Sequence, residues 1–254
     1  MFDIETVPDI DGLRRLHGIG AEASDRSVAE FAFHRRRQTS GSDFLPLHLQ
    51  RVVAISCALR DATSFRVWSL GTPDENEAAL IQRFYDGIEK YTPQLVSWNG
   101  GGFDLPVLHY RGLIHGVQAA RYWDLGDDDR DFRWNNYISR YHMRHLDLMD
   151  LLALYQPRAN APLDQLAQLM GLPGKLGMDG SKVWDAWCDG QIAAIRNYCE
   201  TDVVNTYLVY LCFRMMRGEL TPEAHRTEVA LVRKILGASD EAHWKEFIAR
   251  WPAA

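Results

Sequence analysis

Two acidic side chains stand two residues apart near the start of the chain. Asp3 and Glu5 fall in the largely apolar segment 2–6, which reads as a short strand, and side chains two apart on a strand project from one face. Neighbouring carboxylates repel each other unless they share a cation. The pair therefore indicates a metal site, although Asp-x-Glu alone also fits a solvent-exposed strand end.

Three further oxygen-bearing side chains occur where a chemical role and a structural role compete. Asp104 follows the Gly100–Gly102 turn between an expected strand and an expected helix, where it fits a helix N-cap or first-turn carboxylate equally well. Tyr198 and Asp202 are four residues apart on an expected long helix, so they share one face. Such a pair also fits the boundary of an amphipathic helix. Each feature becomes informative only together with the others.

Taken together, the five side chains are typical of a centre for divalent cations. Oxygen-only ligands suit Mg²⁺ or Mn²⁺ rather than zinc, and none of the nine His has metal-site spacing. Four carboxylates can hold two such ions about 3.5–4 Å apart, which is the geometry for in-line attack on a phosphodiester. The residues thus predict phosphodiester hydrolysis with two Mg²⁺ or Mn²⁺ ions as cofactors.

Three ordered motifs and two further segments carry a family resemblance: FDIET at 2–6, SWNGGGFD at 97–104 and YCETDV at 198–203, with NYISRY at 136–141 and HLDLMD at 145–150. Over residues 1–215 the chain resembles the 3′→5′ exonucleases of the DEDD superfamily, which have a ribonuclease H-like fold. More narrowly, it resembles predicted bacterial exonucleases related to the proofreading domain of family B DNA polymerases. Tyr198 lies four residues before Asp202, and Asn197 stands where the histidine type has His, so the resemblance implies the tyrosine type.

The resemblance implies a role for each matching residue. Asp3 would bridge both ions, and Glu5 and Asp202 would complete the site of the ion that activates water. Asp104 would hold the second ion, partly through water, at the leaving 3′ oxygen. Tyr198 would hydrogen-bond the attacking water, because a phenol with a reference pKa near ~10 is a poor base at neutral pH.

Five more residues are predicted to bind substrate. Trp98, Asn99 and Phe103 would shape the pocket of the terminal nucleotide, where an aromatic face can stack on a base. Lys175 and Lys182, in the loop before the long helix, fit phosphate contacts and ordinary surface lysines equally well.

The elements expected around these residues indicate an α/β fold. Strands are expected at 2–6, 51–60, 65–70, 94–98 and 145–148. Helices are expected at 105–114, 148–155, 163–170, 183–188, 191–217, 223–236 and 241–251, and after a capping box in which Thr72 is the N-cap and Glu75 the N3 residue. We therefore expect a ribonuclease H-like exonuclease fold, in which helices flank a central mixed five-stranded sheet and further helices close the chain.

The domain prediction is a single exonuclease domain over 1–215 with a C-terminal helical extension over 216–254. Within the domain, 9–45 reads as a long loop excursion, partly helical around 28–33, and 121–144 as a polar, aromatic-rich insertion. The basic run at 34–37 fits a solvated loop, with a contact to the substrate backbone as the alternative. Asp147 and Asp150 fit helix-start carboxylates, with a supporting role beside the ions as the alternative.

The composition is that of an ordinary globular chain. With 254 residues, 46% hydrophobic and 24% charged, it excludes wholly disordered, collagen-like and coiled-coil proteins. The formal net charge of −6 argues against a broad basic face that grips nucleic acid, but not against a small acidic site. There is no long apolar run, no signal-peptide pattern at the N-terminus and no CxxC pair, so we expect a cytoplasmic protein with reduced thiols and no membrane partner.

The sequence therefore predicts a divalent-metal-dependent 3′→5′ exonuclease that releases nucleoside monophosphates from single-stranded 3′ ends, with DNA favoured over RNA. The length leaves no room for a polymerase domain, so the chain would act alone or serve a polymerase or repair complex in trans. The alternatives are a catalytically silent nucleic-acid- or protein-binding module on the same fold and a structure-specific endonuclease. The choice between DNA and RNA, the oligomeric state, the pathway, the role of 121–144 and a native start upstream of Met1 stay open.

Overall fold

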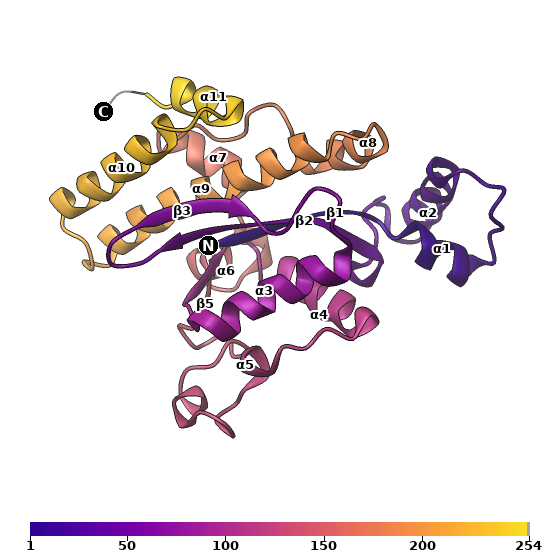
Figure 1. Cartoon of the computed structure of the whole chain (residues 1–254), viewed down its shortest axis with the longest axis horizontal. Helices are drawn as coiled ribbons and strands as arrows, with labels where there is room; N and C mark the ends of the chain where they lie inside the picture. The colour runs from indigo at the N-terminus through magenta and orange to yellow at the C-terminus, as the bar shows by residue number, and fades with distance from the viewer. Residues whose placement is uncertain (253–254) are drawn as a thin grey trace.

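The computed structural model describes residues 1–252 as a mixed α/β molecule (Figure 1). The strands are β1 (Phe2–Pro8), β2 (Gln50–Arg60), β3 (Phe65–Ser69), β4 (Leu95–Ser97) and β5 (His145–Asp147). The helices are α1 (Ile10–His17), α2 (Asp25–Ser40), α3 (Glu77–Tyr91), α4 (Asp104–His115), α5 (Ala120–Trp123), α6 (Leu148–Leu152), α7 (Leu163–Leu169), α8 (Val183–Cys188), α9 (Ile192–Met216), α10 (Pro222–Gly237) and α11 (Ala242–Arg250).

The strands form two sheets rather than the single five-stranded sheet that the sequence predicts. β1, β2 and β3 are antiparallel in that order, whereas β4 and β5 form a separate parallel pair. β1 and β4 lie beside each other, but within residues 1–252 no ladder joins them. β4 and β5 have only three residues each, which leaves little strand to extend the ladder. The mixed α/β class is confirmed, and the continuous five-stranded sheet is not.

β1 is longer than the predicted strand and runs on to Pro8, paired with β2 throughout. Its register shifts between Glu5 and Thr6, an irregularity of the kind that re-aims side chains. Phe2 and Ile4 enter the core that β1 and β2 share with α3 and α4. Because side chains alternate along a strand, Asp3 and Glu5 lie on the opposite face, which α9 covers.

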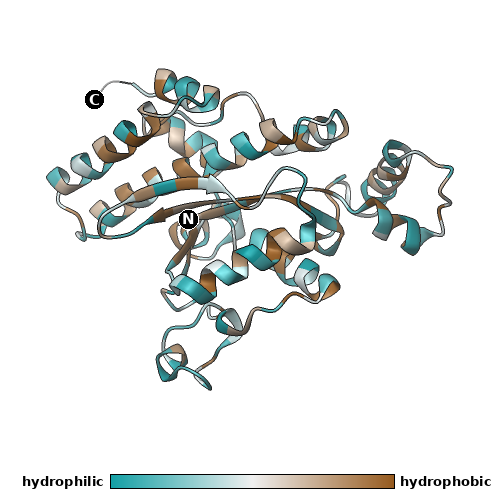
Figure 2. Cartoon of the chain, in the orientation of Figure 1, coloured by the Kyte–Doolittle hydropathy of each residue, from teal (hydrophilic) through white to brown (hydrophobic). Residues whose placement is uncertain are grey.

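Helices cover both faces of the three-stranded sheet (Figure 1). α9 crosses one face and contacts all three strands, while α3 and α4 pack against the other. Figure 2 shows hydrophobic colour along the central strands, whereas the surrounding helices alternate between the two colours. α10 and α11 add Val232, Leu236, Trp244 and Phe247 to a second core on α9 and β3. The division into 1–215 and 216–254 stays a prediction.

The segment 9–45 is mostly helical rather than a loop, and the helix predicted around 28–33 is confirmed within the longer α2. α1 and α2 form a hairpin that projects from the body of the molecule (Figure 1). A small core of Leu13, Val28, Ala32 and Leu45 holds the two helices together. Ser24 caps α2 at its start, and a left-handed glycine, Gly41 with φ 76°, ends it. The hydrophobic periodicity of α2 is weak, so its caps are the clearer signal in the sequence, whereas α1 has a strong amphipathic pattern.

The predicted capping box at Thr72 is also wrong. Thr72 and Glu75 do bond to each other, but they close a separate turn, and α3 begins only at Glu77, with Asn76 as its N-cap. The Glu77 side chain is buried and accepts a hydrogen bond from the Val52 backbone N–H at 2.7 Å. This long-range contact fixes the start of the helix, and local sequence does not reveal it.

The remaining helices lie within a few residues of their predicted positions. α6 is the main exception, because it ends at Leu152 rather than continuing to Tyr155. Leu154 and Tyr155 have φ angles of 51° and 59°, so the backbone leaves the helical region there. Across residues 1–252, the structure has no helix with the length and apolarity that a membrane span requires.

Candidate active site

β1 and α9 bring the first and third sequence motifs into contact. One ligand atom each from Asp3, Glu5 and Cys199 lie within 4.8 Å of one another. The Cys199 thiol approaches both the backbone oxygen and the Oδ2 of Asp3 at 3.4 Å. Two neighbouring carboxylates on β1 therefore face the helix that carries Tyr198 and Asp202.

Asp104 comes from the layer opposite α9 and, with Asp3, Glu5 and Asp202, makes up the acidic group. It is the first residue of α4, its exposed fraction is 3%, and its Oδ1 accepts the backbone N–H of Ile4 at 3.1 Å. Ile4 stands between Asp3 and Glu5, so this bond fixes the start of α4 against the strand that carries both. The predicted first-turn position of Asp104 is confirmed, and the same residue also belongs to the acidic group.

Asp202 supplies an unsatisfied buried acceptor. The exposed fraction of Asp202 is 8%, and its Oδ1 has no hydrogen-bond partner among residues 1–252. A buried carboxylate oxygen without a partner is costly, because it has lost its hydration and gained nothing in exchange. A bound cation would supply the missing partner.

The electrostatics of the four carboxylates also fit a cation site. Burial, followed by the charges of Asp104 and Asp202, raises the pKa of Asp3 well above its usual range. Burial and the Asp3 charge do the same for the pKa of Glu5. Burial raises the pKa of Asp104 to about 7 and that of Asp202 to about 6. Without a cation, the folded protein therefore holds protons on this group that the unfolded chain would release.

The donor set fits hard divalent ions better than soft ones. Four carboxylates supply oxygen ligands of the kind that Mg²⁺ and Mn²⁺ prefer. Burial and the neighbouring charges of Asp3 and Glu5 raise the pKa of the Cys199 thiol, so it stays protonated. A protonated thiol is a poor metal ligand, which leaves the oxygens as the coordinating atoms.

Tyr198 remains a neutral phenol in this setting. Its exposed fraction is 7%, and burial together with the charges of Asp202, Glu5 and Asp3 raises its pKa. A tyrosinate would add negative charge to an acidic group, so the hydroxyl keeps its proton. It is available to donate a hydrogen bond and unsuited to act as a base.

The two candidate phosphate-binding lysines have different settings. The Lys175 Nζ lies 5.2 Å from the centroid of the Tyr198 ring, and its charge favours the ionised forms of Asp3, Glu5 and Asp202. The Lys182 Nζ instead bonds within its own loop, to the Gly177 carbonyl at 2.8 Å. The structure thus brings Lys175 to the acidic group and leaves Lys182 outside it.

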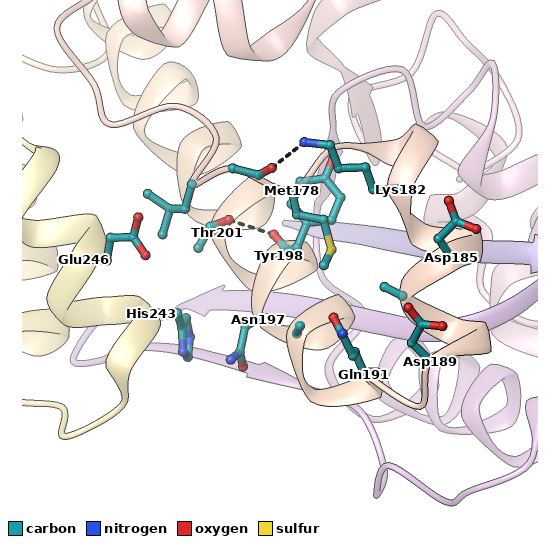
Figure 3. A pocket seen from close by; sticks show the side chains of 14 residues that line it. Met178, Lys182, Asp185, Asp189, Gln191, Asn197, Tyr198, Thr201, His243 and Glu246 are labelled. Carbon is teal, nitrogen blue, oxygen red and sulfur yellow. Dashed lines mark hydrogen bonds between the residues drawn. The ribbon is translucent and has the colours of Figure 1, made fainter.

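A cavity of 540 Å³ adjoins Tyr198 (Figure 3). Lys182, Asn197, His243 and Glu246 are among the side chains that line it, and they come from the loop before α8, from α9 and from α11. None of the four carboxylates lines this cavity. Tyr198 therefore lies between the acidic group and the cavity, which are separate sites.

The glycine-rich turn before Asp104 is held by a residue whose second role the sequence did not reveal. Asp147 caps α6, as its predicted helix-start role requires. It also accepts the backbone N–H groups of Asn99 at 3.0 Å and Gly101 at 2.8 Å. Asn99 has a left-handed φ of 65°, and a Cβ on Gly100 would lie 2.5 Å from the Ser97 Cβ. The turn thus needs both its glycine and its carboxylate clamp, and only the first is visible in a local motif.

The three predicted pocket residues diverge in the structure. The Trp98 Nε1 donates to the Ala161 carbonyl at 3.1 Å, so the indole packs toward the loop before α7. Asn99 lies inside the turn, where its Oδ1 occupies the space that a Cβ on Gly102 would need. Phe103 directly precedes Asp104 and lies against Phe44, with 5.7 Å between ring centroids. Their role in binding substrate stays a prediction.

Cys199 is the other contributor that sequence reasoning missed. It is fully buried on α9, against Asp3 of β1. Its position next to Tyr198 in the third motif is the signal that could have placed it against β1.

Part of the chain is similar in sequence to two DNA polymerases. The chain is 26% identical over 145 residues to the catalytic polypeptide of DNA polymerase epsilon from Saccharomyces cerevisiae, covering 54% of this chain and 6% of that protein. It is 24% identical over 149 residues to a DNA polymerase of Archaeoglobus fulgidus, covering 58% of this chain and 19% of that protein. The chain thus spans only a small part of either relative.

A family model covers most of the chain. Residues 42–251 match the family described as predicted 3′–5′ exonucleases related to the exonuclease domain of PolB. The match includes Asp104, Tyr198 and Asp202 and begins after Asp3 and Glu5. The chain belongs to the family of predicted 3′–5′ exonucleases related to the exonuclease domain of PolB.

Proposed function

We propose that this protein is a divalent-metal-dependent 3′→5′ exonuclease of the tyrosine DEDD type, with a ribonuclease H-like fold. It hydrolyses phosphodiester bonds at single-stranded 3′ ends and releases nucleoside monophosphates. The observation that carries the proposal is the acidic group itself. Asp3 and Glu5 on β1 lie close together, the charges of Asp104 on α4 and Asp202 on α9 act on both, and the Oδ1 of Asp202 has no hydrogen-bond partner within residues 1–252. Family membership supports the same class of reaction.

The proposed roles follow from the position of each side chain. Asp3, Glu5, Asp104 and Asp202 would hold two Mg²⁺ or Mn²⁺ ions, which when bound supply Lewis-acid stabilisation of charge on the phosphodiester. Tyr198 would orient the attacking water through its neutral hydroxyl, because its raised pKa excludes a role as base. Lys175 would add positive charge beside the group and attract the phosphate backbone.

DNA is the favoured substrate, and a polymerase or repair complex is a candidate partner in trans. Both relatives are named as DNA polymerases, and this chain spans a small part of each. The proposal therefore places the removal of nucleotides on this chain. Sugar discrimination depends on contacts to the 2′-OH, so DNA and RNA need to be compared directly.

A 5′-labelled single strand, as DNA and as RNA, tests the proposal. Each would be incubated with the protein in Mg²⁺, in Mn²⁺ or with chelator, beside an Asp3→Ala/Asp202→Ala double variant. We expect a ladder that shortens from the 3′ end and is absent with chelator and in the double variant. Cleavage of a circular single strand, which has no 3′ end, would instead favour the endonuclease. Turnover no higher than that of the double variant, in folded protein that binds Mn²⁺, would favour the silent binding module.

A further inference from the structure

The α1–α2 hairpin carries an exposed aromatic side chain to the edge of the candidate active site. Phe44 follows α2, and its exposed fraction is 54%. Its ring lies 5.7 Å from that of Phe103, and the two planes are tilted by 53°. Phe103 is the residue before Asp104, so this aromatic pair adjoins the start of α4. The family match begins at residue 42, after both helices of the hairpin.

The backbone of Phe44 is held in place although its ring is exposed. The Arg36 Nε donates to the Phe44 carbonyl at 3.0 Å, and Arg37 pairs with Asp43 at 3.3 Å. The next residue, Leu45, is buried in the core of the hairpin. An aromatic ring on a fixed backbone loses little conformational entropy when a ligand covers it, so the geometry favours binding.

The hairpin also forms ion pairs with α8 and the residue that follows it. Arg26 on α2 pairs with Asp185 at 3.0 Å and with Asp189 at 2.8 Å, near α8. Its contacts therefore reach from α8 to the start of α4. The C-terminal end of α2 is basic, and Arg35 there is exposed and has no ion pair within the part of the chain described. Arg36 and Arg37, which contact the Phe44 carbonyl and Asp43, place positive charge beside the exposed ring of Phe44 and the partly buried ring of Phe103. Such a surface suits a ligand that combines flat rings with phosphates.

We propose that Phe44 and Phe103 form a two-ring platform on which a base near the 3′ end of the substrate stacks, with the end of α2 beside its phosphates. The proposal rests on the proposed function and adds a binding residue to it. Stacking of a base on an aromatic ring is tolerant of sequence, so the platform would hold any strand end. It gives the hairpin a part in binding substrate.

Kinetics of two matched variants test the platform. Phe44→Ala removes the outer ring, and Phe31→Ala removes another exposed ring of the same hairpin, which packs on His17 rather than on Phe103. We expect Phe44→Ala to raise KM about tenfold with kcat within about twofold, because one stacking contact is lost. Phe31→Ala should leave both constants unchanged. Equal effects of the two variants would overturn the proposal.

A strand with a missing base separates stacking from a structural role. Single abasic residues would be placed in turn at each of the last three positions of a DNA strand. At one position the difference in KM between wild type and Phe44→Ala should disappear, since there is no base to stack. A difference that persists on all three strands would mean that Phe44 acts only through the shape of the hairpin, which contradicts the platform.

A binding measurement keeps the platform distinct from the enzymatic activity. A strand ending in 2-aminopurine would be titrated with protein in Ca²⁺, and its fluorescence would report stacking without turnover. We expect wild type and Phe31→Ala to quench the fluorescence and Phe44→Ala to bind with much less quenching. Quenching without any hydrolysis in Mg²⁺ or Mn²⁺ would keep the platform and reject the exonuclease. Hydrolysis with equal quenching by wild type and Phe44→Ala would keep the exonuclease and reject the platform.

Discussion

At the scale of single residues, burial determines the chemistry of the acidic group. Asp3, Glu5, Asp104 and Asp202 each have a raised pKa, and burial is the largest cause in every case. Such carboxylates are poor contributors to stability when ionised and good ligands when a cation replaces their protons. The same burial keeps Tyr198 neutral. One physical cause thus accounts for both the proposed ligands and the proposed orienting hydroxyl.

The first prediction concerns pH. The folded pKa values of Asp104, about 7, and Asp202, about 6, lie above those of the unfolded chain, so the folded state binds more protons. The stability that these protonated groups contribute is complete below the unfolded pKa and is lost as pH rises through the folded pKa. In chelator, the melting temperature should therefore fall between pH 5 and about pH 8 relative to the same protein in Mn²⁺. Parallel curves with and without Mn²⁺ would contradict this prediction.

The second prediction concerns Asp104→Asn. The amide oxygen can still accept the Ile4 N–H, but the variant carries no charge. We expect a higher melting temperature in chelator, a smaller rise on addition of Mn²⁺, and turnover lowered by about a thousandfold or more. Asp86→Asn, at an exposed position on α3, is the matched control and should change none of these. A melting temperature lowered in chelator would show that the charge of Asp104 stabilises the fold.

At the scale of elements, local sequence predicted the helices and strands better than their boundaries and the contacts between them. The long helix and the strand carrying Asp3 were predictable, because their apolar patterns are strong. The start of α3 was not, since Glu77 is fixed by Val52 and Arg111, which are distant in sequence. The break between β1 and β4, which lie side by side without a ladder within residues 1–252, depends on packing that no motif encodes. The residues of the candidate site could be nominated from three ordered motifs taken together, whereas the role of Asp147 at the turn depends on contacts across 48 residues.

The turn that positions Asp104 gives the third prediction. Asp147→Ala would release the backbone N–H groups of Asn99 and Gly101 and remove the cap of α6. We expect a loss of about 2–3 kcal/mol in the free energy of unfolding, measured in urea. Turnover should fall even where the variant is fully folded, because the turn no longer fixes the start of α4. Asp150→Ala, which loses only an exposed ion pair with Arg140, should cost less than about 1 kcal/mol. Equal costs for the two variants would refute the clamp.

The buried guanidinium of Arg111, which joins three elements, gives the fourth prediction. Arg111 on α4 bonds to Asp9, which follows β1, and to Glu77 at the start of α3, both at 2.6 Å. Arg111→Met would remove the guanidinium that both buried carboxylates share, leaving Glu77 with His115 and the Val52 N–H and Asp9 with the Gly12 N–H. It should cost about 3–5 kcal/mol. Arg83→Ala breaks the half-exposed pair with Glu75 and should cost less than about 1 kcal/mol. A cost for Arg111→Met as small as that of the control would refute the idea that this ion pair holds β1, α3 and α4 together.

At the scale of the whole molecule, the candidate site depends on contacts between distant parts of the chain. Asp3 and Cys199 are 196 residues apart and touch, and Ile4 and Asp104 are 100 residues apart and hydrogen-bond. The relevant layers are β1 between α9 on one side and α4 on the other (Figure 1). The family match covers only two of the four carboxylates, Asp104 and Asp202, because Asp3 and Glu5 precede residue 42. The complete group therefore needs β1 as well as the matched region.

Release of the terminal nucleotide from a 3′-labelled single strand, followed as a function of Mn²⁺, tests the central claim most directly. Wild type and Asp202→Asn would be compared at equal concentration of folded protein. The account predicts that labelled mononucleotide is the first product, that its rate saturates with Mn²⁺, and that Asp202→Asn lowers the rate by about a thousandfold or more. Labelled oligonucleotides as first product, or equal rates in the two proteins, would contradict it.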